Sequence, residues 1–199
     1  MRHLWKSQII LLSLTLVSAY TPLTNEQSAF LISSLPRPIS SYLSPEGSSL
    51  LSPILTPRPS GSEGASRVLN HFTQFFNLNV SNWLISLDEF IDSTPRGDIK
   101  FTNFVATRDP PGMRTGDVGR LVVAAHYDSK WFRKGSSMEN FIGATDSAVP
   151  CAMLMFAALA LDKFLLESES KTSSSDELED PVGLQVRSWS ALLKVDYIL

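Results

Sequence analysis

The sequence contains little cysteine and no cluster of basic residues. One cysteine, Cys151, occurs among the 199 residues, so no disulfide bond can form within the chain. The 17 lysines and arginines are scattered among 20 aspartates and glutamates, which gives a formal net charge of −3 at pH 7. Because no basic stripe is present, the sequence is not typical of a protein that binds nucleic acid. The length is that of one globular domain.

The sequence also lacks the run of about 20 apolar residues that a membrane-spanning helix needs. Residues 148–161 are apolar, but this shorter run is typical of a buried core helix. Residues 9–17 form a short apolar core that follows Arg2 and Lys6, the pattern of a secretory signal peptide over residues 1–19. An uncleaved membrane anchor is the alternative. We expect a secreted protein without stable membrane association after signal cleavage.

The first part of the chain changes character at about residue 50. Residues 20–49 are rich in serine and proline, with one short helix expected in the stretch NEQSAFLISSL. Ser62 is a favourable N-cap for a helix whose apolar residues recur at helical spacing. His71 lies within that helix and is expected to be an ordinary, partly buried histidine. Three strands are predicted after this helix, over residues 82–91, 99–107 and 121–125.

The composition changes again after residue 166. Residues 167–181 are acidic and rich in serine, which predicts a flexible, solvated insertion. Residues 182–199 begin like another buried strand and then lose any clear period. Earlier in the chain, Asn79 opens an Asn-Val-Ser sequon, a candidate glycosylation site that agrees with secretion.

Three polar side chains stand at the ends of apolar segments. His126 and Asp128 follow the strand 121–125, and Asp146 lies in a small-residue turn before the apolar helix. Strand, loop and helix in this order form half of a parallel α/β unit, in which ligands bind beyond the carboxyl ends of the strands. Imidazole and carboxylate together suit zinc, and the His-x-Asp spacing lets Asp128 orient the imidazole. The alternative for Asp146 is helix capping, for which aspartate is favoured.

Two short strings in this region carry a family resemblance: HYDSK at residues 126–130 and GATDSAVPCAM at residues 143–153. Together with the stretch PRPSGSEGASRVLNHF, they resemble the glutaminyl-peptide cyclotransferases, which are relatives of the zinc aminopeptidases. The resemblance covers roughly residues 50–185, so that residues 50–166 correspond to the N-terminal part of the family domain. It implies an α/β fold of the zinc-exopeptidase type, with a mixed, largely parallel sheet flanked by helices, present here in incomplete form.

The resemblance also implies an activity. The family converts the N-terminal glutamine of peptides or proteins to pyroglutamate and releases ammonia, with one zinc ion that polarises the γ-carbonyl and a glutamate as general acid and base. Asp146 matches the zinc-binding aspartate, and His126 matches a histidine kept near the metal, beside which Asp128 lies. Some members pair the cysteine at Cys151 with one just before the histidine. Because Ala125 holds that position here, we expect a buried, inert thiol.

The sequence departs from the family after Gln185. There the family strand ends in a Phe-Asp-Gly-Glu-Glu type motif whose glutamates supply the proton shuttle and a zinc ligand, and no such acidic pair appears here. We therefore expect a truncated product whose residues 182–199 combine a strand start with a tail unlike the family. Such a product would bind zinc poorly and lack catalytic residues and activity. A secreted zinc aminopeptidase is the alternative enzyme, and a non-catalytic fragment is the alternative from another class.

Overall fold

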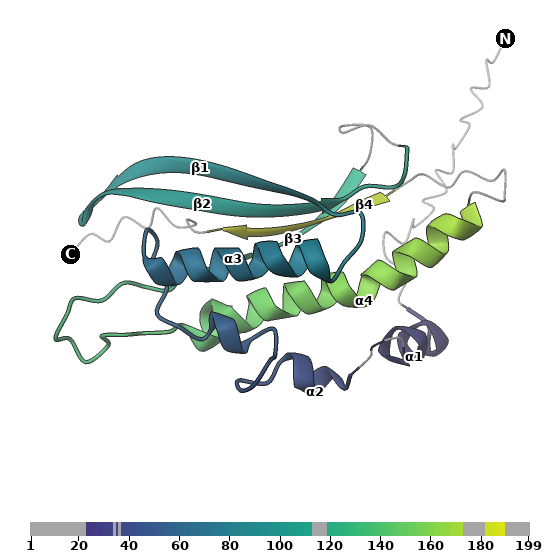
Figure 1. Ribbon diagram of the computed structural model, residues 1–199, viewed down its shortest axis with the longest axis horizontal. Coiled ribbons are helices and arrows are strands. Elements are labelled where there is room, and N and C mark those ends of the chain that lie inside the picture. The colour runs from purple at the N-terminus through teal and green to yellow at the C-terminus, as the bar shows by residue number, and fades with distance from the viewer. Residues whose placement is uncertain (1–22, 34, 36, 113–118, 173–181, 190–199) are drawn as a thin grey trace, which may run out of the picture.

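The computed structural model describes residues 23–33, 35, 37–112, 119–172 and 182–189. The elements within them are α1 (Asn25–Ser33), α2 (Ile39–Tyr42), η1 (Ser52–Ile54), α3 (Glu63–Leu78), β1 (Leu84–Thr94), β2 (Gly97–Arg108), β3 (Gly119–His126), η2 (Ala144–Ala148), α4 (Val149–Thr172) and β4 (Val182–Trp189). Figure 1 shows α3 and α4 along one face of the sheet, with α1 and α2 on the far side of these helices. The predicted signal peptide, residues 1–19, lies outside the described residues, as do residues 173–181 and 190–199.

The four strands are arranged in the order β1-β2-β4-β3. β1 and β2 form a long antiparallel hairpin, β2 and β4 pair antiparallel, and β4 and β3 pair parallel. A hairpin closes with a short turn, whereas the parallel pair needs a crossover, to which α4 contributes. The predicted α/β class, with a mixed sheet and flanking helices, is confirmed. One of the three pairings among the described strands is parallel, so this part of the sheet is less parallel than the resemblance implied.

α3 begins where the sequence predicts. The Ser62 hydroxyl accepts a hydrogen bond from the backbone N–H of Ala65 at 3.1 Å, which caps the first turn. The apolar face of the helix packs on the sheet, since the rings of Phe72 and Phe76 lie 5.7 and 5.4 Å from the ring of Phe104 on β2. All three rings are buried. Each contributes about 2 kcal/mol to stability through the apolar area it removes from water.

α4 is the core helix that the apolar run predicts. Ala152 and Ala158 are completely buried, and Cys151 and Met155 are each 2% exposed. The small side chains of Cys151, Ala152 and Ala158 let the helix pack closely, at the density of a protein interior. By length and composition the stretch 144–167 is long and apolar enough to cross a membrane, which corrects the expectation that no run of the sequence reaches the length of a spanning helix. Core helices pass the same test. Figure 1 shows the helix lying along the sheet beside α3.

Two elements extend further than the sequence predicts. α4 continues to Thr172, so residues 167–172 are helical and do not form part of a flexible insertion. Extending an existing helix needs no new nucleus, and glutamate and lysine are good helix formers. β4 runs to Trp189, past the point at Gln185 where the strand pattern weakens. Pairing with β2 on one side and β3 on the other satisfies the backbone of β4 even without a regular side-chain pattern.

The segment 20–49 contains the predicted short helix, α1. It also reaches the core, which the sequence did not predict. The side chain of Tyr42 is 1% exposed, and its ring lies 5.6 Å from the ring of Phe156 on α4, between centroids. The guanidinium of Arg37 lies 4.4 Å above the Tyr42 ring. A single tyrosine among serines and prolines produces no hydrophobic period, so its burial becomes visible only in the packed structure.

Candidate functional site

His126, Asp128 and Asp146 lie together at the carboxyl end of β3, as the sequence predicts. His126 is the last residue of β3, Asp128 comes two residues later, and Asp146 lies in the distorted turn η2 just before α4. β4 runs parallel to β3 up to the same end, where Trp189 pairs with His126. Because η2 leads directly into α4, the packing of α4 on the sheet determines where η2 meets the end of β3.

The imidazole of His126 lies between the two carboxylates. Its Nδ1 is 3.2 Å from Asp128 Oδ1 and 3.0 Å from the Asp128 carbonyl oxygen, and its Nε2 is 2.7 Å from Asp146 Oδ1. Since only the imidazolium donates from both nitrogens, this arrangement favours the protonated ring. The hydrogen bond to Asp128 is the largest cause that raises the pKa of His126 to about 9, burial opposes it, and Asp146 adds to the rise.

Asp128 is held on both of its oxygens. Oδ1 faces the His126 ring, and Oδ2 accepts a hydrogen bond from the hydroxyl of Ser60 at 2.5 Å. Ser60 is 5% exposed and comes from the segment before α3, far away in the sequence. The sequence did not reveal this contact. Ser60 and Ser62 stand in the same Ser-Gly-Ser string, and no local pattern distinguishes the one that caps α3 from the one that binds Asp128.

Asp146 is much more accessible than Asp128. Its side chain is 84% exposed, against 23% for Asp128. Within the described part of the chain, its carboxylate bonds to His126 and makes no hydrogen bond to a helix amide, so the capping alternative is not realised. The turn that presents it depends on Gly143, which has a φ of +53°, and a Cβ there would lie 2.5 Å from the carbonyl oxygen of Asp146. The Asp146–Ser147 peptide is cis.

The start of α4 is tied to the end of β3 through a single carbonyl group. The His126 carbonyl oxygen accepts hydrogen bonds from the Ser147 hydroxyl and from the Cys151 thiol, the latter at 3.3 Å. Cys151 is a buried thiol, as expected for a structural cysteine. Both donors lie just beyond Asp146, so these bonds hold the turn η2 against the strand that ends in His126.

The described residues do not form a complete set of zinc ligands. An exposed carboxylate such as that of Asp146 is a suitable zinc ligand, and His126 supplies an imidazole beside it. Catalytic zinc, however, needs three protein ligands and an open position. No group of three or more histidine, cysteine, aspartate or glutamate side chains among the described residues is arranged to hold a metal. The donor set found here is therefore incomplete, and no chemical step through a metal follows from it.

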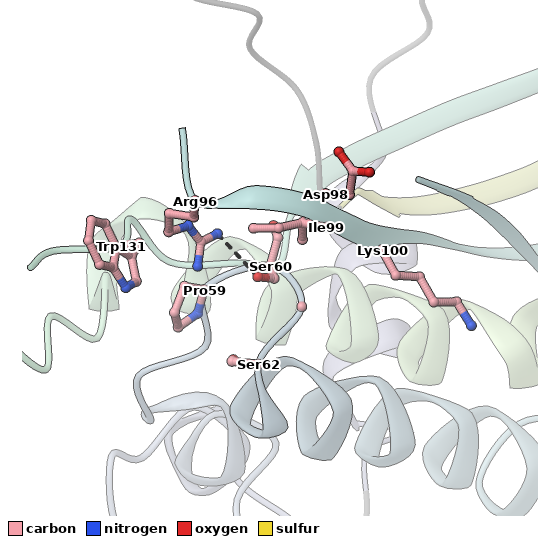
Figure 2. Close-up of a pocket in the computed structure, with 9 residues that line it drawn as sticks. Pro59, Ser60, Ser62, Arg96, Asp98, Ile99, Lys100 and Trp131 are labelled. Carbon is pink, nitrogen blue, oxygen red and sulfur yellow. Dashed lines mark hydrogen bonds between the residues drawn. The ribbon is translucent and has the colours of Figure 1, made fainter. Parts of the chain in front are cut away.

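A pocket of about 340 Å³ adjoins this site. Figure 2 shows Arg96, from the turn between β1 and β2, lying between Trp131 and Ser60. The Arg96 guanidinium donates to the Ser60 carbonyl oxygen at 3.3 Å and lies 5.3 Å from the centre of the Trp131 ring. Burial lowers the pKa of Arg96, and the charge of Asp128 acts in the opposite direction. Because Ser60 lines the pocket and also binds Asp128, the pocket and the site share one wall. The lining residues are Pro59, Ser60, Gly61, Ser62, Arg96, Asp98, Ile99, Lys100 and Trp131.

Two other residues singled out in the sequence belong to α3. His71 is partly buried, its Nε2 lies 3.1 Å from the carbonyl oxygen of Leu50, and burial lowers its pKa while that hydrogen bond opposes the change. This is the ordinary histidine that we expected. Asn79 is the exposed C-cap of α3, and its side-chain amide donates to the carbonyl oxygen of Phe75 at 3.1 Å.

Sequence comparison relates this chain to known enzymes. Residues 103–175 match the description of peptidase family M28. The chain is 38% identical over 128 residues to the glutaminyl-peptide cyclotransferase of Bos taurus, a match that covers 64% of this chain and 34% of the relative. It is 43% identical over 136 residues to the glutaminyl-peptide cyclotransferase-like protein of Mus musculus, covering 68% of this chain and 32% of the relative. The chain thus spans about a third of the length of these curated relatives.

Structural comparison agrees with the sequence. The crystal structure of Macrostomum lignano glutaminyl cyclase superposes with a TM-score of 0.63 at 30% identity, and the match covers 86% of this chain and 43% of that one. A leucine aminopeptidase precursor from Bacteroides thetaiotaomicron has a TM-score of 0.51 at 14% identity, with 70% of this chain and 43% of that one covered. The second likeness concerns the fold alone. The two together place the described sheet and helices in the fold that both kinds of enzyme share.

Proposed function

We propose a function for this chain on the premise that it is related to the glutaminyl-peptide cyclotransferases. The chain supplies part of the active site of an enzyme that cyclises N-terminal glutamine. In that reaction the α-amine attacks the γ-carbonyl carbon of the same residue. A carbon–nitrogen bond forms, the bond to the side-chain nitrogen breaks, and ammonia leaves. The substrates would be peptides or proteins that begin with glutamine.

One observation carries the proposal: an exposed Asp146 carboxylate is held by His126 at the carboxyl end of a buried strand. Both residues lie within the part of the chain that matches peptidase family M28. A carboxylate in this place is poised to bind a ligand, because the protein satisfies one of its oxygens and leaves the rest of the group to solvent. We infer that Asp146 is the residue of this chain that binds zinc, a Lewis acid for the carbonyl group in such enzymes.

His126 and Asp128 would then act on Asp146 by orientation. Ser60 and the imidazole fix the carboxylate of Asp128, Asp128 fixes the ring, and the ring fixes Asp146 through Nε2. Ligand-orienting partners of this kind typically change metal affinity 10- to 100-fold when they are removed. The described residues provide this orienting series and one exposed ligand, and the general acid and base of the reaction is not among the residues whose geometry is described.

The test is a chimeric enzyme. Residues 50–185 would replace the matching segment of the bovine cyclotransferase, and ammonia release from a glutaminyl peptide would be measured. We expect activity in the chimera and its loss, by at least about a hundredfold, in Asp146→Asn, because a missing ligand costs several kcal/mol of transition-state stabilisation. Glu139→Gln, a change in the exposed loop between Asp128 and Asp146, is the matched control and should leave the rate unchanged. A folded chimera that releases no ammonia contradicts the proposal.

The match to peptidase family M28 favours a second candidate, a zinc aminopeptidase. Release of free leucine from a leucyl peptide by the same chimera measures this activity directly. A chimera that hydrolyses leucyl peptides and leaves glutaminyl peptides intact would decide for the peptidase. For the 199-residue chain alone we expect weak zinc binding, because its described residues form no three-ligand group. Near-stoichiometric zinc in the purified chain contradicts that expectation.

We also place the protein in the secretory pathway. The predicted signal peptide over residues 1–19 supports this, and so does the exposure of Asn79, the first residue of the sequon, at the end of α3. Expression in secreting cells followed by glycosidase treatment should reduce the apparent mass of the chain. Asn79→Gln should abolish that reduction, and a chain that stays inside the cells contradicts the assignment.

A further inference from the structure

Arg58 is buried without a carboxylate partner. It is the largest of the fully buried side chains in the described part of the molecule, with 0% exposure. Removing a charge from water is costly, and buried arginines are usually paired with an acid for that reason. No carboxylate among the described residues lies within ion-pair distance of it. Burial lowers the pKa of Arg58, and the nearby Cys151, Asp128 and Asp146 act in the opposite direction.

The Arg58 guanidinium donates to backbone carbonyl groups. Nε donates to the oxygen of Tyr127, and Nη2 donates to that of Gly143 at 3.1 Å. Nη1 donates both to the oxygen of Ile142 and, at 3.2 Å, to that of Thr56. All three nitrogens of the planar group are therefore hydrogen-bonded to main-chain oxygens. Because the guanidinium is rigid, it constrains the positions of these oxygens.

Three of the four carbonyl groups that it binds, all except that of Thr56, belong to the two segments that carry the site. Tyr127 lies between His126 and Asp128, and residues 142–143 lead directly into the turn that presents Asp146. These segments are separated by a polar loop and meet only where the site forms. One guanidinium thus connects the backbone beside the imidazole to the backbone beside the exposed carboxylate.

Arg58 is itself firmly anchored. Its backbone N–H donates to the Ser129 hydroxyl at 3.0 Å, and its carbonyl oxygen accepts from the Ser129 N–H at 3.2 Å. The first turn of α3 packs directly on the preceding residue, since a Cβ at Gly64 would lie 2.0 Å from the carbonyl oxygen of Pro57. The backbone from which the guanidinium extends is therefore held by the helix on one side and by the loop after β3 on the other.

From these contacts we propose that Arg58 is a positioning residue that sets the distance between His126 Nε2 and the Asp146 carboxylate. The inference concerns geometry alone and holds whether or not the proposed activity is correct. A lysine at this position keeps the charge but offers a single ammonium group, which cannot bind carbonyls on both segments in one plane. Arg58→Lys should therefore loosen the contact of His126 with Asp146 while the core of the domain stays intact.

The experiment records the ring-nitrogen signals of His126 by NMR in the 199-residue chain, which contains three histidines. Asp146→Asn gives the signal of a ring that has lost its charged partner. We expect Arg58→Lys to move the Nε2 signal at least halfway toward that position. In the double variant, the second change should add little, because both act on one contact. Phe75→Leu is the control for lost stability, since it lies about 16 Å further along α3 than Gly64.

The outcomes are decisive in each direction. An unchanged His126 signal in Arg58→Lys overturns the proposal, and so does an equal shift in Phe75→Leu, which would indicate general loosening. If Arg58→Lys does not fold, Ser129→Ala makes the same comparison, because it removes the hydroxyl that anchors the Arg58 backbone and leaves the guanidinium in place. It should shift the signal in the same direction by a smaller amount, and no shift there counts against the proposal.

Discussion

Among the residues whose side chains are described, two arginines are buried, near opposite ends of β3, and they are satisfied in different ways. Arg58, near the carboxyl end of β3, is 0% exposed and donates to main-chain carbonyls. Arg108, at the end of β2, is 2% exposed, and its Nε lies 3.9 Å from the carboxylate of Asp162 on α4. Through β4, the Arg108 end of β2 is aligned with the amino end of β3.

The Arg108 end is a structural clamp. Asp162 is 7% exposed and accepts hydrogen bonds from the Ser81 N–H and from the indole N–H of Trp83, each at 3.0 Å. Both oxygens of this carboxylate thus accept hydrogen bonds from the protein. At the other end, Asp128 and Asp146 both face the His126 ring, and Asp128 also accepts a hydrogen bond from Ser60, while Arg58 is occupied by carbonyls. The comparison shows that a buried cation without an acid can organise the backbone around a carboxylate, here that of Asp146, which stays exposed.

The largest expected effect on stability comes from replacing Arg58, the buried cation without a carboxylate partner. Arg58→Met should lower the free energy of unfolding by about 4 kcal/mol, because several buried carbonyls lose their donors at once. Urea unfolding monitored by tryptophan fluorescence measures it. Arg67→Met, in an exposed pair with Glu63, should cost less than about 1 kcal/mol. Equal losses in the two variants would mean that the guanidinium contributes nothing specific.

The role of Arg108 is tested by replacing Asp162, the carboxylate beside it. Asp162→Ala should lower the free energy of unfolding by about 3 kcal/mol, because it removes the carboxylate beside the buried Arg108 and frees two N–H donors. The His126 ring signals should stay where they are, since Asp162 lies about 20 Å along α4 from Val149, the start of the helix that follows Asp146. Glu46→Ala, an exposed residue, is the control and should change stability by less than about 0.5 kcal/mol. A shift of the His126 signals would show that the two ends are coupled.

A smaller effect is expected at Ser60, which holds Asp128. Ser60→Ala should cost about 1.5 kcal/mol of stability, the size of a hydrogen bond to a charged group. Ser62→Ala, which removes the cap of α3, should cost about 1 kcal/mol and is the matched comparison. Only Ser60→Ala should move the ring signals of His126. If both serine variants move them equally, the contact of Ser60 with Asp128 does not orient the imidazole.

The smallest effect concerns His71, a partly buried base that, unlike the arginines, can lose its proton. Burial lowers its pKa below the ordinary value of 6.5, so the unfolded chain binds the proton more readily than the folded one. The contribution of neutral His71 to stability is therefore complete above pH 6.5 and is lost as the pH falls below it. Urea midpoints between pH 8 and pH 5 should fall less in His71→Gln than in the unchanged chain. Parallel curves would contradict the assignment.

Much of the candidate site could be predicted because its members are close in sequence to elements with strong patterns. His126 and Asp128 end an apolar strand, and Asp146 opens an apolar helix, so the α/β topology alone brings them together. The N-cap at Ser62 was likewise predictable, since capping depends on residues within one helical turn. The full extent of β4 was not, because its backbone is satisfied by partners on two other strands.

The chemistry at the end of β3 could be inferred without the structure. It consists of an imidazole and two carboxylates, which lie within the stretches 126–130 and 143–153 that resemble one enzyme family. Local propensity and apolar periodicity are sufficient for this, because each acts over a few residues. Only the tertiary structure decided that Arg58 and Ser60 support the site. Their contacts span about 70 to 85 positions of sequence. No short sequence pattern predicts that an arginine will be buried among carbonyl groups. Arg58 is held in that position by the first turn of α3 on one side and by the loop after β3 on the other.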